Sequence, residues 1–109
     1  MAISSARMHS ETIESGALRI WFFGDIDMTF TVTNQAALEE VVANPPHELE
    51  FDASELTFID STGLRALATL ATCVRSAGGE VRTINSSEPL RRIIEVTGLG
   101  ERFGLIDQT

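Results

Sequence analysis

The chain has 109 residues, of which 43% are hydrophobic, and its formal net charge at pH 7 is −8. This length suits one domain with a substantial core, and the acidity argues against nucleic acid and anionic membranes as partners. No apolar run approaches the roughly 18 residues of a membrane span, and the first residues lack the apolar core of a signal peptide. We therefore expect a cytoplasmic protein.

The beginning of the chain predicts a flexible tail followed by a hairpin. We expect residues 1–7 to form the tail and residues 8–109 to form a single domain. An edge strand at 9–14 precedes the turn signal Ser15-Gly16, and an apolar strand at 17–23 follows it.

Two aspartates, Asp25 and Asp27, alternate about Ile26 where this apolar strand ends. In extended backbone both carboxylates point to the same side. One interpretation, which we favour from the sequence alone, is a solvated strand end. The other places Asp27 beside a second polar corner, Asp60-Ser61, at the end of a neighbouring strand.

A helix is expected after the aspartates. Thr33 or Asn34 can cap its start, and Asn44-Pro45-Pro46 ends it because proline cannot continue a helix. Its predicted apolar stripe consists of Ala37, Leu38, Val41 and Val42. His47 follows in a loop, has no second ligand at metal-binding spacing and predicts no metal site.

The middle of the chain predicts a strand at 48–52, a short break at 53–55 and a buried strand at 56–59. A helix then runs from Ser61 to about Ala77. Its core face is expected to contain Leu64, Leu67, Leu70, Ala71 and Val74. Its polar face is expected to contain Arg65, Thr69, Thr72 and Ser76.

The last third predicts a strand at 80–84, a helix that starts near Ser86–Pro89 and stops at Gly98, and a short strand at 103–106. The inward side of this helix is expected to carry Leu90, Ile93, Ile94 and Thr97. Strands that alternate with helices after an initial hairpin predict an α/β domain. We expect a mixed sheet of four or five strands packed with three or more helices.

Ser61 has two interpretations. As structure, the hydroxyl of Ser61 or Thr62 accepts a hydrogen bond from the first turn of the helix, which is worth about 1 kcal/mol. As function, an exposed serine at a helix start suits a phosphate acceptor, because the kinase supplies the ATP, the metal and the base. Arg65, one turn along, and the helix dipole would stabilise the phosphate.

Enzymatic interpretations lack essential parts. A nucleophilic serine needs a base, and the only histidines, His9 and His47, lie in unsuitable positions. The sequence has neither the Gly-x-Ser-x-Gly elbow nor a glycine-rich phosphate loop. We therefore expect a protein that is not an enzyme and that needs no cofactor.

The segment Phe58-Ile59-Asp60-Ser61-Thr62-Gly63-Leu64 closely resembles the signature of the STAS family, the anti-sigma factor antagonists. Gly24-Asp25-Ile26-Asp27 resembles the family's Gly-Glu-Leu-Asp, and Phe51-Asp52-Ala53-Ser54 resembles the strand that leads to the signature. The likeness covers about residues 10–106. Residues 28–34 match less well, because the family starts its first helix sooner after the aspartate.

The resemblance implies a switch at Ser61. Unphosphorylated family members bind an anti-sigma factor that is also a serine kinase, and so free the sigma factor. Phosphorylation of the matching serine weakens that complex, and a serine phosphatase resets it. By motif position Ser61 is the acceptor, with Asp27, Asp60, Thr62 and Gly63 around it. The expected partner-binding set is Asp25, Asp27, Ser61, Thr62, Gly63, Arg65 and Thr69.

Two alternatives stay open. The chain can be a STAS scaffold subunit of a larger signalling or transport assembly, in which case binding ignores the state of Ser61. It can also be a nucleotide- or small-ligand-binding domain that uses Asp27, Asp60 and the helix N-terminus. In each case we expect a monomer when no partner is present.

Overall fold

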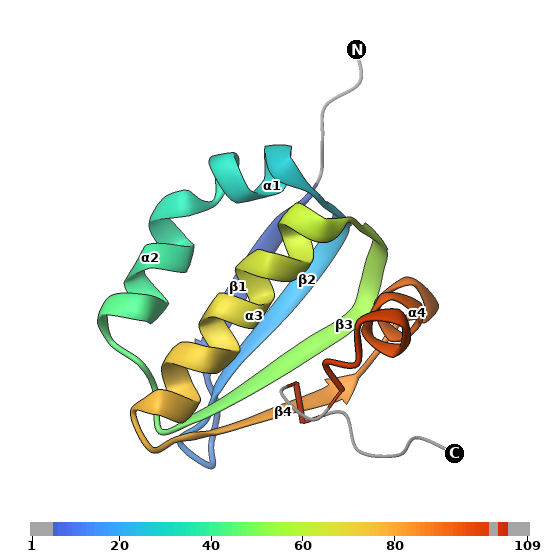
Figure 1. The fold of residues 1–109 in the computed structure, drawn as a ribbon. Helices are drawn as coiled ribbons and strands as arrows, with labels where there is room; N and C mark the ends of the chain where they lie inside the picture. Colours follow the sequence, from blue (N-terminus) through green and yellow to red (C-terminus); the bar gives the residue numbers. More distant parts are fainter. Residues whose placement is uncertain (1–5, 101–102, 105–109) are drawn as a thin grey trace.

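The computed structural model describes residues 6–100 and 103–104. The described elements are β1 (Arg7–Thr12), β2 (Leu18–Ile26), α1 (Met28–Thr33), α2 (Gln35–Ala43), β3 (Glu48–Ile59), α3 (Ser61–Ser76), β4 (Glu80–Asn85) and α4 (Glu88–Thr97). The strands form one sheet in the order β1-β2-β3-β4 (Figure 1). β1 is antiparallel to β2, whereas β2, β3 and β4 are parallel. The predicted mixed α/β fold is confirmed.

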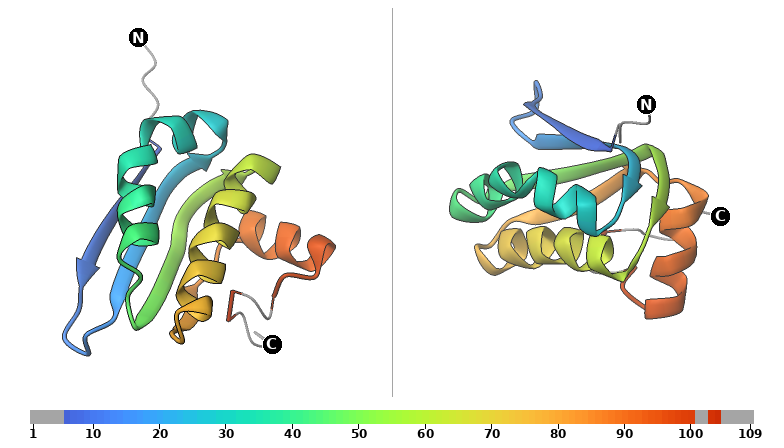
Figure 2. Two further views of the ribbon diagram at one scale, coloured as in Figure 1. Left: turned by 60° about the vertical axis from the view of Figure 1, so that its left-hand side comes forward. Right: turned by 90° about the horizontal axis from the view of Figure 1, so that it is seen from above.

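Helices cover one face of this sheet. α2 and α3 run along that face, and α4 lies beside the carboxyl ends of β3 and β4 (Figure 2). The predicted core face of α3 is confirmed: its buried side chains are Leu64, Leu67, Leu70, Ala71 and Val74. They pack on a row of rings in which Phe51 lies between Phe22, at 5.6 Å between centroids, and Phe103, at 5.7 Å. This core supports the end of the sheet at which β2 and β3 stop.

The edges of the hairpin differ from the prediction. β1 starts at Arg7 and not at His9, because Arg7 pairs with Phe23 and its guanidinium carbon lies 4.3 Å from the centre of that ring. Residues 6 and 7 are therefore part of the domain, while residues 1–5 lie outside the described residues. β2 continues past Phe23 to Ile26, because Asp25 and Ile26 pair with Phe58 and Ile59 of β3. Gly24 permits the irregularity in register just before them, with a φ of +87° that other residues rarely adopt.

The helical region after β2 starts earlier than predicted. Asp27 caps α1 at once, because its carboxylate accepts a hydrogen bond from the Phe30 N–H at 3.1 Å. Asn34 separates α1 from α2, but its side chain donates to the carbonyl of Phe30 at 3.0 Å and does not cap α2. In the predicted stripe only Val41 is buried, and Val42 is 40% exposed. The expected helix is α2, which follows Asn34 and ends before Asn44 as predicted, and α1 is an additional helix that the sequence did not predict.

β3 is continuous, so the predicted break at 53–55 is wrong. The carboxylate of Asp52 accepts hydrogen bonds from the backbone N–H and the hydroxyl of Ser54, at 3.0 and 2.8 Å. Asn85 of β4 donates to its other oxygen at 2.9 Å. These bonds hold the irregular part of the strand in the sheet. Burial raises the pKa of Asp52, but the bonds from Asn85 and Ser54 and the charge of Arg19 outweigh it and lower the pKa below its ordinary value.

The sheet face that no described helix covers carries an ion cluster centred on a buried glutamate. Glu50 is 3% exposed and lies in register between Arg19 of β2 and Arg82 of β4. One carboxylate oxygen accepts from Arg19 at 2.9 Å, and the other pairs with Arg82. Through these two ion pairs Glu50 links β2, β3 and β4.

The C-terminal part agrees with the prediction except at two points. Leu90 and Ile94 of α4 are buried, and Gly98 ends the helix with a φ of +74°. Thr97 is exposed, however, and its hydroxyl donates to the carbonyl of Ile93 at 2.8 Å. Phe103 and Gly104 form a turn, and the rest of the predicted strand at 103–106 lies outside the described residues.

Asp52→Asn is expected to lower the free energy of unfolding by about 1–2 kcal/mol at pH 7. The pKa of Asp52 is lower in the folded protein than in the unfolded chain, so its charge stabilises the fold above about pH 4. That contribution is lost as the pH falls through the folded pKa. Urea unfolding at several pH values measures the difference between variant and wild type. A difference that stays constant down to pH 3 would contradict the assignment.

Candidate functional site

Two parallel strands end side by side at the candidate site. The last pair in the register of β2 and β3 is Ile26 with Ile59. Asp27 and Asp60 follow these residues directly, and each carboxylate caps the helix that comes next. The structure thus places Asp27 at the neighbouring corner to Asp60, as the second of the two interpretations expected.

Asp60, and not Ser61 or Thr62, caps α3. Its Oδ1 accepts a hydrogen bond from the N–H of Gly63 at 2.8 Å. The expectation that a hydroxyl caps this helix is therefore wrong. Ser61 is the first residue of α3 and is exposed, and its hydroxyl has no hydrogen bond within residues 6–100 and 103–104. The cap formed by Asp60 leaves the Ser61 hydroxyl accessible.

Gly63 sets the distance between α3 and β2. A Cβ atom at this position would lie 1.9 Å from the carbonyl oxygen of Ile26, far closer than atoms can approach. The backbone N–H of Asp60 donates to the same carbonyl at 3.4 Å. The glycine therefore permits a close approach of helix to strand, and this contact holds the two aspartate corners together.

The other predicted partner-binding residues lie in two places. Arg65 and Thr69 are exposed one and two turns along α3, and the Thr69 hydroxyl donates to the carbonyl of Arg65 at 2.9 Å. Asp25 lies near the carboxyl ends of β2 and β3, where its carboxylate accepts a hydrogen bond from the Thr57 hydroxyl at 2.7 Å. Thr62, Arg65 and Thr69 also line a groove of about 440 Å³ between α3 and the two preceding helices, with Thr31, Leu38, Glu39, Val42, Ala43, Ala66 and Leu70.

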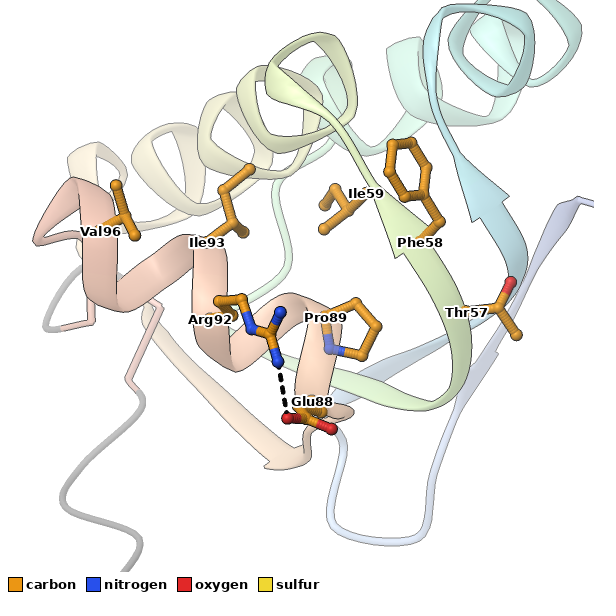
Figure 3. A pocket seen from close by; sticks show the side chains of 8 residues that line it. All are labelled: Thr57, Phe58, Ile59, Glu88, Pro89, Arg92, Ile93 and Val96. Atoms are coloured by element: carbon orange, nitrogen blue, oxygen red, sulfur yellow. Dashed lines mark hydrogen bonds and ion pairs between the residues drawn. The ribbon is translucent and has the colours of Figure 1, made fainter.

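A second groove, of about 470 Å³, lies between the end of β3 and α4 (Figure 3). Phe58, expected to be buried in its strand, is 49% exposed and forms part of its wall. The sequence alone did not indicate this groove, because β3 ends at Ile59 and α4 begins only at Glu88. The apolar run at 56–59 masked the fact that Phe58 points away from the core.

Residues 6–100 and 103–104 contain no group of side chains suited to a metal ion and no helix suited to a membrane span. Within the described residues, no three His, Cys, Asp or Glu side chains are grouped closely enough to hold a metal ion. His9 contacts Glu11 at 3.0 Å, and His47 is exposed. No helix in this part of the chain has the length and apolar character needed to cross a membrane.

Comparison with known proteins identifies the family. The STAS domain model matches residues 11–109, and the chain belongs to the STAS domain family. A search of curated proteins gave no match.

Solved structures share the fold of this chain. An anti-sigma factor antagonist from Mycobacterium paratuberculosis is 29% identical with a TM-score of 0.78, over 94% of this chain and 86% of the other. The phosphorylated Bacillus cell fate determinant SpoIIAA is 21% identical with a TM-score of 0.66, over 86% of each chain. The murine Slc26a9 anion transporter is 16% identical with a TM-score of 0.63, over 94% of this chain but 20% of the transporter.

Gly63→Ala is expected to destabilise the domain by about 1–3 kcal/mol, since the methyl group meets backbone that cannot move independently. Urea unfolding measures the change. Thr62→Ala, at the adjacent position of the same helix, serves as a control and is expected to change stability by less than about 0.5 kcal/mol. Equal stability of Gly63→Ala and wild type would show that the close approach at Ile26 is not constraining.

Proposed function

We propose that this chain is an anti-sigma factor antagonist of the cytoplasm whose partner binding is switched by phosphorylation of Ser61. The unphosphorylated form binds an anti-sigma factor with serine kinase activity and releases the sigma factor, and a serine phosphatase resets the switch. The observation that carries the proposal is the exposed Ser61 hydroxyl, which Asp60 leaves free by capping α3. The likeness to an anti-sigma factor antagonist and to a phosphorylated SpoIIAA supports it.

The electrostatics of the corner suit a reversible switch. A phosphate adds about −1.5 to −2 charge, which the N-terminus of α3 stabilises through its dipole. The carboxylates of Asp27 and Asp60 cap the adjoining helices and add negative charge nearby. In a closed interface the phosphate would also lose its hydration. The fold therefore tolerates the phosphate, whereas a complex formed over Ser61 is weakened by it.

Ser61 is expected to take one phosphate when the protein is incubated with ATP and the serine-kinase anti-sigma factors of the same organism. Fragment mass spectrometry locates the phosphate. Ser61→Ala removes it and keeps partner binding, whereas Ser61→Asp is expected to weaken binding about a hundredfold, equivalent to nearly 3 kcal/mol.

Ser76→Ala is the matched control, because Ser76 is an exposed serine at the other end of the same helix and lies outside the partner-binding set. It is expected to be phosphorylated like wild type. A folded Ser61→Ala protein that has lost partner binding would contradict the switch. The absence of phosphate with every candidate kinase, under conditions where a known pair reacts, would favour the scaffold alternative.

Arg65 is expected to stabilise the phosphorylated form. It is exposed on α3 four residues after Ser61, the spacing at which two side chains on a helix meet. Arg65→Gln should raise the second pKa of the phosphoserine by a few tenths, because it removes a charge that favours the dianion. Phosphorus NMR during a pH titration measures this. Arg91→Gln on α4 is the control, and equal effects of the two variants would exclude a specific role for Arg65.

The alternative function is a STAS subunit of a larger assembly. It is favoured by the likeness to the murine anion transporter, of which this chain spans about a fifth. A scaffold of this kind would bind its partner equally well as wild type and as Ser61→Asp. The binding measurement with these two proteins therefore separates the alternatives.

A further inference from the structure

Two of the exposed apolar side chains of this protein lie close in the chain to Asp27 and Asp60. The large hydrophobic residues that are exposed within the described part of the chain are Met28, Val32, Val42, Phe58 and Val96. Met28 directly follows Asp27, and Phe58 lies two residues before Asp60. Phe58 is the largest of these side chains, and half of its surface faces solvent. Aromatic side chains at such positions are typical of the energetic centre of an interface.

Phe58 forms one side of the groove between β3 and α4. Figure 3 shows Phe58 and Ile59 on β3 and, on the other side, residues of α4. The α4 residues that line the groove are Glu88, Pro89, Arg92, Ile93 and Val96. Glu88 and Arg92 form an ion pair at 2.8 Å, and both are exposed. The groove is thus an apolar hollow with one charged pair beside it.

The wall of this groove is held in place before any partner binds. The Thr57 hydroxyl donates to the Asp25 carboxylate at 2.7 Å, which joins the ends of β3 and β2 next to Phe58. Ile59 is buried in the core and pairs with Ile26. A preformed surface of this kind loses little conformational entropy on binding.

Phe58 is close enough to Ser61 for one interface to include both. A standard interface buries about 800 Å² on each side, which corresponds to a disc of roughly 16 Å radius. Three residues of extended chain span at most about 10 Å, so the distance between Phe58 and Ser61 is smaller than that radius.

We propose that the groove between β3 and α4 binds an apolar segment of the anti-sigma factor that engages Ser61; this inference rests on the proposed function. The contact has two parts. Phosphorylation changes the charge at Ser61 but not the apolar groove, so the groove holds the partner in both states while Ser61 decides the strength of the complex. A second copy of this chain seated there would also cover Ser61 and would exclude the kinase.

Phe58→Ala is expected to weaken binding at least tenfold. The measurement is calorimetry with each serine-kinase anti-sigma factor of the same organism, in a Ser61→Ala background that prevents phosphorylation. The same fold-change is expected in a Ser61→Asp background, because the groove contact does not depend on the charge at Ser61. Thermal unfolding of each variant confirms that it is folded.

A second pair of variants does not touch the core. Val96 is the penultimate residue of α4 and is 81% exposed. Val96→Glu places a charge in the groove and is expected to weaken binding at least tenfold. Thr12 is exposed on β1 and pairs with Leu18, at the end of the sheet opposite Ser61. Thr12→Glu places the same charge far from the groove and is expected to change binding less than twofold.

The outcomes separate this inference from the proposed function. If wild type binds a candidate and both Phe58→Ala and Val96→Glu bind equally well, the groove assignment alone is overturned. Equal losses from Val96→Glu and Thr12→Glu would overturn it too, since the loss would then come from the added charge and not from its position in the groove. If sedimentation shows a dimer that Phe58→Ala dissociates, the groove belongs to a second copy. If no candidate binds wild type, both proposals fail.

Discussion

The contact between Gly63 and the carbonyl of Ile26 is the constraint on which this end of the molecule depends. A side chain at position 63 would push α3 away from β2, because a Cβ atom there would lie 1.9 Å from the oxygen. With glycine, the first turn of the helix packs directly on the strand end. The ends of β2 and β3, and the two helices that follow them, are thereby held at one corner.

At the same corner the two aspartates have a structural role, whereas the serine does not. The carboxylates of Asp27 and Asp60 each accept a backbone N–H, at 3.1 and 2.8 Å, and so satisfy the starts of α1 and α3. The Ser61 hydroxyl is exposed and forms no hydrogen bond within the described residues. A modification of Ser61 can therefore change the surface without removing a helix cap, which suits a switch that must leave the fold intact.

Two grooves lie near this serine and are similar in character. Each is lined mainly by apolar side chains and carries one acid and one arginine: Glu39 and Arg65 in the groove between α3 and the preceding helices, and Glu88 and Arg92 in the groove between β3 and α4. The second groove differs in having the exposed ring of Phe58 in its wall. A partner that spans Ser61 therefore meets apolar surface beside the serine, and this surface is unchanged by the charge at Ser61.

The sequence by itself determined the mixed α/β fold, the buried face of α3 and the Gly98 stop of α4, because these follow from periodicity and from backbone preferences over a few residues. The signature around Ser61 also indicated the family that the comparison confirmed. Only the tertiary structure decided that β3 is continuous, that Glu50 is buried between two arginines and that Phe58 faces a groove. These features depend on partners about 30 residues away, such as Asn85 for Asp52, and local patterns carry no record of such partners.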